Sequence, residues 1–202
     1  MLGLYRSLKH SNVLSAAECF VDDESMFALV NDLPVNLAHL VGCRTLYPTE
    51  IELASIAWQV LDGACYLNTL GLEHQSLICR NVLLGLDGIV KIACIESCVE
   101  RNPNEAQSGY IKALASIIME VMQKDIKDCG VIGIEDLERW PVDSNAFKFL
   151  SAISTTENIE ALKEQPLVSK KYRLKGELIL LARSVFLSAH IFYSLEENYS
   201  ED

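Results

Sequence analysis

Apolar residues recur with helical spacing along a long central segment of the chain. They run from Ile51 to Leu67 at intervals of three and four residues, a pattern typical of a helix with a buried face. Thr49 is a suitable N-cap. The acidic residues Glu50 and Glu52 lie in the first turn, where their negative charges interact favourably with the positive end of the helix dipole. The pattern predicts a helix that begins after Thr49 and stops at Gly71.

Shorter segments with the same spacing predict six further helices. The segment 111–122 is apolar on several sides, so its helix is expected to be buried. The segment 174–195 has the same character, and two alternatives stay open for it: packing on the body of the protein, or a surface for a partner or a second copy. The predicted segments are Leu2–Leu8, Asn36–Val41, Ile111–Met122, Asp143–Leu150, Glu157–Lys163 and Leu174–Leu195.

Two hairpins of short strands are predicted between these helices. Val13–Phe20 and Met26–Val30 are strand-like runs on either side of a polar turn. Val82–Leu84 and Ile89–Ala93 flank an Asp-Gly pair at 87–88, and Asp-Gly between apolar runs is a hairpin signal. The chain is therefore expected to be mostly helical, with an α+β fold.

The charge balance narrows the classes of partner. The chain of 202 residues carries 28 acidic and 17 basic side chains, a net charge of −11. Such a surface repels phosphate backbones and anionic lipid, so we expect no nucleic acid and no membrane as a partner. The longest apolar run, Leu178–Leu195, contains Arg183 and His190, and its longest stretch without a charge or His is too short to span a bilayer.

The cysteines indicate a reducing compartment. There are seven, the count is odd, and no C-x-x-C motif occurs. Free thiols of this kind are typical of intracellular proteins, and no signal peptide is visible, so we expect a cytoplasmic or nuclear protein. Cys94 and Cys98 are four residues apart, but no further ligand pair accompanies them, and no metal site is predicted.

Six motifs in order resemble the C-lobe of a eukaryotic protein kinase, and the resemblance covers about Leu4 to Val168. It implies an α+β, protein-kinase-like fold with a mostly helical C-lobe and a short hairpin left from the N-lobe. Relatives of this degenerate, pseudokinase-like type are seen in filamentous fungi. The motifs are Leu4–Val13 for the end of the C-helix and its H-x-N loop, Ser25–Pro34 for the fifth strand and hinge, Ile51–Gly71 for the E-helix, His74–Asn81 for the catalytic loop, Asp87–Ile92 for the hairpin before D-F-G, and Ile159–Leu167 for the closing helix.

The resemblance also implies boundaries within the chain. Residues 1–32 would be the N-lobe remnant, with the end of the C-helix, two strands and the hinge. Residues 33–168 would be the kinase-like C-lobe, and residues 169–202 a C-terminal helix with an acidic tail.

The matching catalytic-loop positions are degenerate. They hold His74, Ser76, Ile78 and Asn81 where the family has H-R-D-L-K-P-x-N. Ser76 replaces the Asp base, and a neutral hydroxyl is no base near pH 7. Ile78 replaces the Lys that steadies the γ-phosphate. Cys94 stands at the D-F-G Asp, and its thiol is a poor ligand for Mg²⁺, which prefers oxygen. Of the metal-binding residues, only Asn81 is kept.

Further positions follow from the same resemblance. Val30, Asn31, Leu33 and Leu83 match hinge and adenine positions, and Tyr110 matches the Asp that braces the catalytic loop from the F-helix. The activation segment, about 97–109, is short and has no A-P-E, and no glycine-rich loop precedes residue 1. His74 and Asn81 are expected to serve packing and backbone hydrogen bonds, and Lys91 and Glu96 to face solvent.

These residues predict a catalytically inactive pseudokinase that acts as a protein-interaction module, binds another protein and needs no cofactor. The question of enzyme activity is not closed by the sequence. The alternative is an ATP-dependent serine/threonine-type kinase that uses Mg²⁺ at a rewired site, with its N-lobe missing from this chain. A third reading is a gene remnant without a selected role. The oligomeric state is left open.

Overall fold

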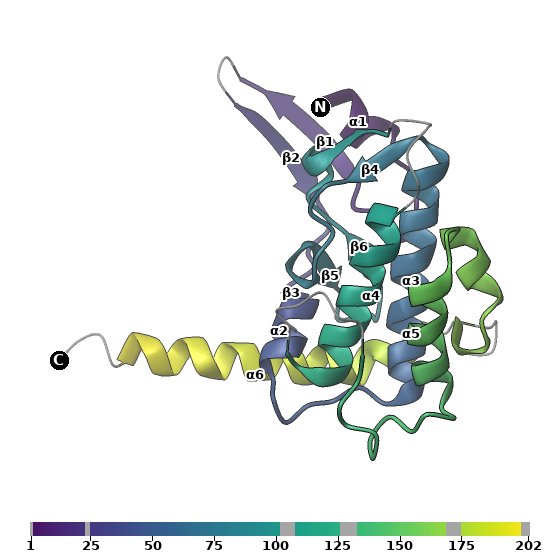
Figure 1. Ribbon diagram of the computed structural model, residues 1–202. Coiled ribbons are helices and arrows are strands. Elements are labelled where there is room, and N and C mark those ends of the chain that lie inside the picture. Colours follow the sequence, from purple (N-terminus) through teal and green to yellow (C-terminus); the bar gives the residue numbers. More distant parts are fainter. Residues whose placement is uncertain (1, 23–24, 102–107, 126–132, 169–174, 199–202) are drawn as a thin grey trace.

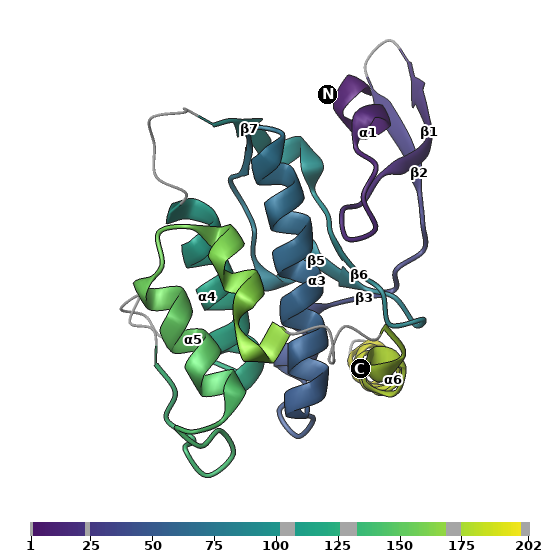
Figure 2. The same ribbon diagram turned by 90° about the vertical axis from the view of Figure 1, so that its right-hand side faces the viewer.

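The computed structural model describes residues 2–22, 25–101, 108–125, 133–168 and 175–198 (Figure 1). Helices surround one long central helix, and three small antiparallel sheets lie along one side and at one end (Figure 2). The elements are α1 (Leu2–Ser7), β1 (Ala16–Val21), β2 (Met26–Val30), β3 (Val35–Asn36), α2 (Leu37–Gly42), α3 (Glu50–Thr69), β4 (Leu72–His74), η1 (Cys79–Asn81), β5 (Val82–Leu84), β6 (Val90–Ile92), η2 (Ile95–Ser97), β7 (Cys98–Glu100), α4 (Ser108–Gln123), α5 (Asn145–Thr155), η3 (Ile159–Glu164), η4 (Pro166–Val168), η6 (Lys175–Leu178) and α6 (Ile179–Asn198), where η denotes a 3-10 helix.

The central helix α3 begins as the sequence predicts. The Thr49 hydroxyl accepts from the backbone N–H of Glu52 at 3.2 Å, and the Glu52 carboxylate accepts from the backbone N–H of Thr49 at 2.7 Å, which makes a capping box. Past the helix end, Gly71 has a φ of 71°, a conformation that favours glycine. Most of α3 is buried, because α4, β6 and the short helices η3 and η4 pack around it.

The two predicted hairpins are both present. β1 pairs with β2, with Phe20 opposite Phe27, and this sheet extends away from the helical body at the N-terminal end (Figure 1). β5 pairs with β6 around the Asp-Gly turn, where Gly88 has a φ of 81°, and β3 adds a third strand to β5. One face of this three-stranded sheet, with Val82, Leu84 and Val90, is fully buried.

Two three-residue strands lie where the sequence predicts none. β4 pairs with β7, with Glu73 opposite Val99, and they connect the start of the catalytic loop to the segment after Cys94. The segment predicted as the activation segment, about 97–109, contains β7 and the start of α4, and residues 102–107 lie outside the described ranges.

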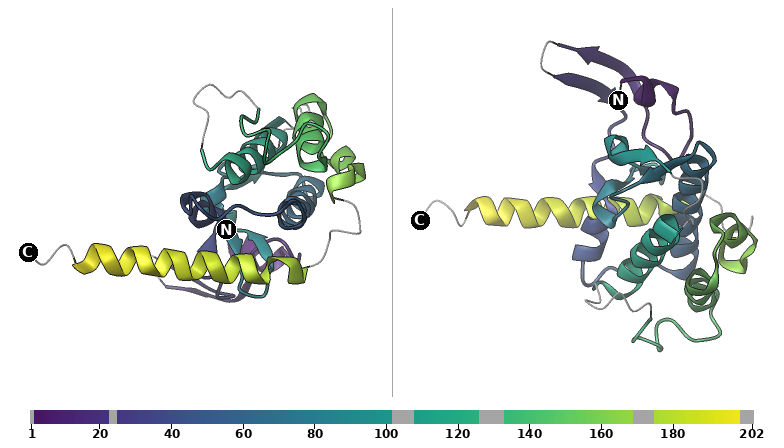
Figure 3. Two further views of the ribbon diagram at one scale, coloured as in Figure 1. Left: turned by 90° about the horizontal axis from the view of Figure 1, so that it is seen from below. Right: turned by 45° about the horizontal axis from the view of Figure 1, so that its top comes forward.

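One face of the C-terminal helix packs on the body of the protein, which is the first of the two alternatives that the sequence leaves open. Its inner face is buried through Leu181, Ala182 and Val185, which pack beside β3 and α2. Leu180 and Leu187 on its outer face are 76% and 61% exposed, and the end of the helix extends beyond the body (Figure 3). Of the described residues, none belongs to a helix long and apolar enough to cross a membrane.

Candidate functional site

His74 holds the catalytic-loop segment against the end of β6. Its side chain is buried, and Nε2 donates to the backbone O of Ala93 at 2.7 Å. Nδ1 therefore accepts, and it receives the backbone N–H of Ser76 at 3.2 Å. Both ring nitrogens are used for backbone hydrogen bonds, so the expected packing role of His74 is confirmed.

Ser76, Asn81 and Cys94 form one hydrogen-bonded group. Asn81 Nδ2 donates to the Ser76 backbone O at 2.8 Å and to the Ser76 hydroxyl at 3.3 Å. Asn81 Oδ1 accepts from the Cys94 thiol at 3.3 Å. The tertiary structure thus brings together three predicted site positions from η1, the loop before it and the loop after β6. Their polar atoms are used for contacts with one another.

Cys94 has an unusual backbone. Its φ and ψ are 55° and 45°, in the left-handed region, where residues other than glycine are uncommon and Asn and Asp are the most frequent. Burial raises the pKa of its thiol, and the nearby Glu96 carboxylate adds to the rise. The thiol is therefore kept protonated, which suits its role as donor to Asn81.

Tyr110, which the sequence motifs match to the bracing Asp, lies in α4. Its hydroxyl donates to the backbone O of Leu72 at 3.0 Å and is hydrogen-bonded to the backbone of His74. Burial raises the pKa of Tyr110, so the brace is a neutral hydroxyl. A phenol can support the loop backbone without supplying the charge of a carboxylate.

Ile78 lies apart from this group. Its side chain is 48% exposed and follows Leu77 into η1, so solvent surrounds much of the position where the family has Lys. An aliphatic side chain there offers no hydrogen-bond donor.

The hinge positions line a separate cavity of about 530 Å³. Asn31 and Leu33 contribute to it together with Asp87 and Lys91 from the β5–β6 hairpin. Val30 lies in β2 and is 37% exposed, and Leu83 lies opposite Lys91 in the sheet, and neither lines this cavity. Of the four predicted hinge and adenine positions, Asn31 and Leu33 therefore line this cavity, and Val30 and Leu83 do not.

The prediction that Lys91 faces solvent is wrong. It is only 9% exposed, although its place in the hairpin predicted a solvated side chain. Lys91 lines the cavity together with the hinge residues Leu33 and Pro34. Alternation along a short strand cannot show that the second face is also covered.

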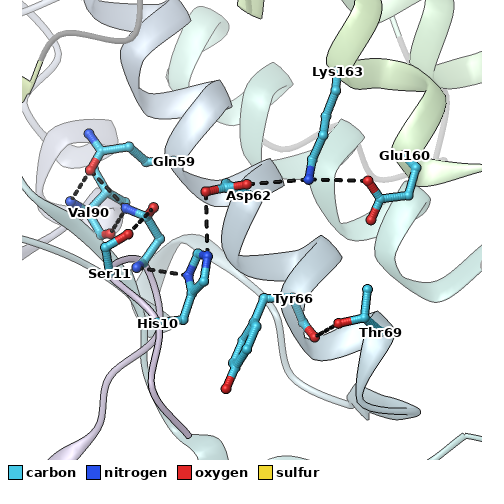
Figure 4. Close-up of polar contacts among 10 residues, drawn as sticks. His10, Ser11, Gln59, Asp62, Tyr66, Thr69, Val90, Glu160 and Lys163 are labelled. Atoms are coloured by element: carbon cyan, nitrogen blue, oxygen red, sulfur yellow. Dashed lines mark hydrogen bonds and ion pairs between the residues drawn. The ribbon is translucent and has the colours of Figure 1, made fainter.

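A second polar network joins the segment after α1 to the C-terminal half of the chain (Figure 4). His10 Nε2 lies 3.5 Å from Asp62 Oδ2, and Lys163 Nζ lies 3.3 Å from Asp62 Oδ1 and 3.2 Å from Glu160 Oε2. The His10 ring also stacks on Tyr66, with 4.6 Å between centroids. The network ties two distant segments, the loop that holds His10 and the short helix η3, to α3.

Asn12 and Gln59 connect the segment after α1 to α3 and β6 through buried amides. Asn12 Nδ2 donates to Gln59 Oε1 at 3.0 Å and to the backbone O of Val90 at 2.8 Å. Gln59 Oε1 also accepts from the backbone N–H of Val90 at 2.8 Å. These bonds fix the β5–β6 hairpin against α3.

The chemistry available at the degenerate loop is that of neutral donors and acceptors. Mg²⁺ is bound in proteins through carboxylates and other hard oxygen ligands. Ser76, Asn81 and Cys94 supply a hydroxyl, an amide and a protonated thiol, a poor match to that ion. Among the residues that the structure describes, no group of three or more His, Cys, Asp or Glu side chains is arranged to hold a metal.

The family is decided by comparison with known sequences. The family described as protein tyrosine and serine/threonine kinase matches residues 2–122, more than half of the chain. The chain belongs to the protein kinase family. The fold is accordingly an α+β kinase-like fold, as the sequence motifs predict.

Individual relatives are distant. The serine/threonine-protein kinase Tao of Drosophila melanogaster is 25% identical over 162 residues, which cover 76% of this chain and 16% of that protein. TAO3 of Xenopus laevis is 25% identical over 162 residues, 76% of this chain and 18% of that protein. SULU of Caenorhabditis elegans is 27% identical over 139 residues, 65% of this chain and 14% of that protein. The chain thus spans less than a fifth of the length of these relatives.

Sequence reasoning missed one contact of this kinase domain near the degenerate loop. The Tyr5 hydroxyl in α1 donates to the Glu96 carboxylate at 2.5 Å. Glu96 is exposed, as expected, but it is also paired. No spacing in the sequence joins these two residues, although their places at the end of the C-helix and after the D-F-G position could have suggested it.

Proposed function

We propose that this kinase domain is a catalytically inactive pseudokinase and acts by binding another protein. The observation that carries the proposal is the group of Ser76, Asn81 and Cys94, in which the positions for base and metal ligands are neutral and bonded to one another. Phosphoryl transfer depends on positioned charge around the γ-phosphate and Mg²⁺. A site without carboxylates lacks that charge. The division at residues 32 and 168 belongs to the same proposal.

A thermal melt of the purified chain tests the inactive state. A ligand at about 100 times its Kd stabilises a protein by about 2.7 kcal/mol, and each kcal/mol raises the Tm by about 2–4 °C at this size. We expect millimolar ATP with Mg²⁺ to leave the Tm unchanged, and radiolabelled ATP to give no phosphate transfer to a general substrate. A Mg²⁺-dependent rise of several degrees would contradict the proposal.

The second candidate is an ATP-dependent serine/threonine kinase with a rewired site, working as part of a longer protein. It is favoured by the similarity to proteins named as serine/threonine kinases. The exposed Glu96 carboxylate, two residues from Cys94, is the acid nearest in sequence to a metal position. Under this candidate the Mg²⁺-dependent rise in Tm appears and is lost in Glu96→Gln. A rise that survives Glu96→Gln speaks against this carboxylate as the ligand.

A further inference from the structure

The outer face of helix α6 presents a partly apolar stripe to solvent. Leu180 is 76% and Leu187 61% exposed, and Arg183 and Ser184 between them are exposed as well. These four residues stand at positions i, i+3, i+4 and i+7, so they lie on one side of the helix. The opposite side packs on α2 and β3. Seen end-on, α6 lies at the edge of the molecule, with its outer side turned away from the other described elements (Figure 2).

The end of α6 continues past the elements on which its beginning packs (Figure 1, Figure 3). The helix has 20 residues, and at 1.5 Å per residue it is about 30 Å long. In the sequence, the outer stripe continues with Ile191, Ser194 and Asn198 at the same spacing. Most of the stability of a helix in a protein comes from packing of one face, so the end of α6 gains stability if a further surface covers it.

The polar side chains near the exposed part of the stripe allow close packing. The Ser188 hydroxyl donates to the backbone O of Ser184 at 2.9 Å, so its proton is used within the helix. A small side chain such as Ser184 lets a second helix approach closely between the two leucines. Arg183 borders the stripe, and in the part of the chain that the structure describes it has no ion pair.

The charges along α6 match those of an antiparallel copy of the same helix. Arg183 lies near its beginning, whereas the acidic residues Glu196 and Glu197 come near its end. At 3.6 residues per turn, positions 183 and 197 lie nearly one above the other, on the same side of the stripe. A twofold axis near position 190 therefore brings position 183 of each copy to position 197 of the other. A symmetric interface requires a patch that is complementary to itself, and this one is.

We propose that the outer face of α6 binds the same face of a second copy of this chain, with the two helices antiparallel. Leu187 and Ile191 of both copies meet near the twofold axis, and Arg183 of each copy lies beside Glu197 of the other. A pair of helices about 30 Å long makes a small interface, and the net charge of −11 on each copy opposes association. The expected Kd is therefore micromolar. The inference goes beyond the proposed function, because the pairing does not depend on whether the domain is active.

The test is sedimentation equilibrium of the purified full chain over a series of micromolar concentrations. We expect the molar mass to rise from 22.5 kDa towards twice that value. Leu187→Ser should raise the Kd at least about tenfold. Phe27→Ser, at an exposed apolar position of the β1–β2 hairpin, is the matched control and should leave the Kd unchanged. A monomer at every concentration overturns the proposal, and so does a dimer that Phe27→Ser disrupts and Leu187→Ser does not.

Exchange of charges tests the antiparallel arrangement. Arg183→Glu and Glu197→Arg should each raise the Kd at least about fivefold, because each places like charges together at two symmetric points. The double variant restores opposite charges and should return to within about twofold of the wild type. Lys148→Glu, at an exposed position of α5, makes the same change in net charge as Arg183→Glu and should have little effect.

Two results of the exchange would overturn the proposal. If Lys148→Glu weakens the dimer as much as Arg183→Glu, the net charge explains the effect and the contact does not. If the double variant is as weak as the single ones, the two positions do not meet and the antiparallel arrangement is wrong. Circular dichroism of each variant checks that the helices are retained. These measurements contain no nucleotide, so their failure is separate from a failure of the ATP experiments.

Discussion

The Tyr5 hydroxyl donates a hydrogen bond to the Glu96 carboxylate at 2.5 Å, across 91 positions of the chain. Tyr5 lies in α1, and Glu96 lies two residues after Cys94 in η2. Burial raises the pKa of Tyr5, and the bond to Glu96 raises it further. The contact fixes α1 to the loop that carries the degenerate metal position.

Removing that hydroxyl is expected to destabilise the protein. Tyr5→Phe keeps the ring and loses a hydrogen bond to a partly exposed carboxylate, so we expect a loss of about 0.5–1.5 kcal/mol in the free energy of unfolding. Urea denaturation followed by circular dichroism measures it. Tyr47→Phe is the control, since the Tyr47 ring, rather than its hydroxyl, contacts Lys124 and Arg139. Equal losses in the two variants would show that the contact with Glu96 adds nothing.

His10 is expected to make stability depend on pH. Burial lowers its pKa and the charges of Lys163 and Lys91 lower it further, against the opposing effect of Asp62. The unfolded state therefore binds a proton more readily, so this contribution is present above the ordinary pKa of 6.5 and is lost as the pH falls through and below it. Protonation at Nδ1 also removes the acceptor for the backbone N–H of Asn12, a bond of 3.1 Å.

The measurement is urea denaturation at a series of pH values between about 7.5 and about 5. His10→Asn keeps an acceptor near the Nδ1 position and cannot titrate, so its stability should fall less steeply than that of the wild type over this range. The lowered pKa of His39, also caused by burial, contributes equally to both proteins. Parallel pH curves for the wild type and His10→Asn would refute the assignment.

Gly63 marks the closest approach of the H-x-N loop to α3. A methyl group there would lie 2.6 Å from the backbone O of Asn12 and 3.1 Å from Ile92 Cδ1. Because backbone cannot yield as a flexible side chain can, Gly63→Ala should cost about 1–3 kcal/mol in the free energy of unfolding. The control is Gly42→Ala, because no atom lies within 4 Å of the place where a methyl group would be added at that helical glycine. This variant should have an unchanged free energy of unfolding or be stabilised by up to about 1 kcal/mol. A stable Gly63→Ala protein with unchanged denaturation would contradict the packing described.

The left-handed backbone at Cys94 is expected to tolerate some substitutions and to destabilise the protein with others. Cys94→Asn should change the free energy of unfolding by less than about 0.5 kcal/mol, because Asn tolerates this conformation and can still donate to Asn81. Cys94→Val should cost about 1–2 kcal/mol, since a β-branched side chain is strained there. At Cys98, where φ and ψ are −81° and 134°, the same change to Val is the control and should be tolerated. Thermal melts compare the three proteins, and similar losses at 94 and 98 would argue against backbone strain.

Much of the fold could be predicted because its signals are local. The apolar stripe and the capping residue Thr49 determined α3 to within a residue at each end. The Asp-Gly turn and the runs beside it determined the β5–β6 hairpin. The identities of Ser76, Ile78 and Cys94 follow from alignment of motifs, and the matching family confirms the kind of domain in which they lie. What the tertiary structure adds is the bonding among Ser76, Asn81 and Cys94.

Other features depended on residues that are distant along the chain. β4 and β7 are three residues long, too short for any periodicity, and they form only because each supplies the other's hydrogen bonds across 23 intervening residues. Lys91 is buried at a cavity that it lines together with the hinge residues Leu33 and Pro34, which lie almost 60 positions earlier in the chain. The cavity of about 260 Å³ beside α5 is lined by Leu137, in a segment that hydrogen bonds from Gln123 and Trp140 hold to the end of α4.

The sequence by itself determined which segments are helical, because that depends on residue type and local spacing, and it predicted which side chains occupy the kinase positions. The tertiary structure decided which polar atoms satisfy one another and which apolar side chains stay in water. Those outcomes depend on how distant segments pack, as Tyr5 with Glu96 and Leu137 beside α5 illustrate. Hydrogen bonding and burial are properties of the packed chain, and no pattern within one segment contains them.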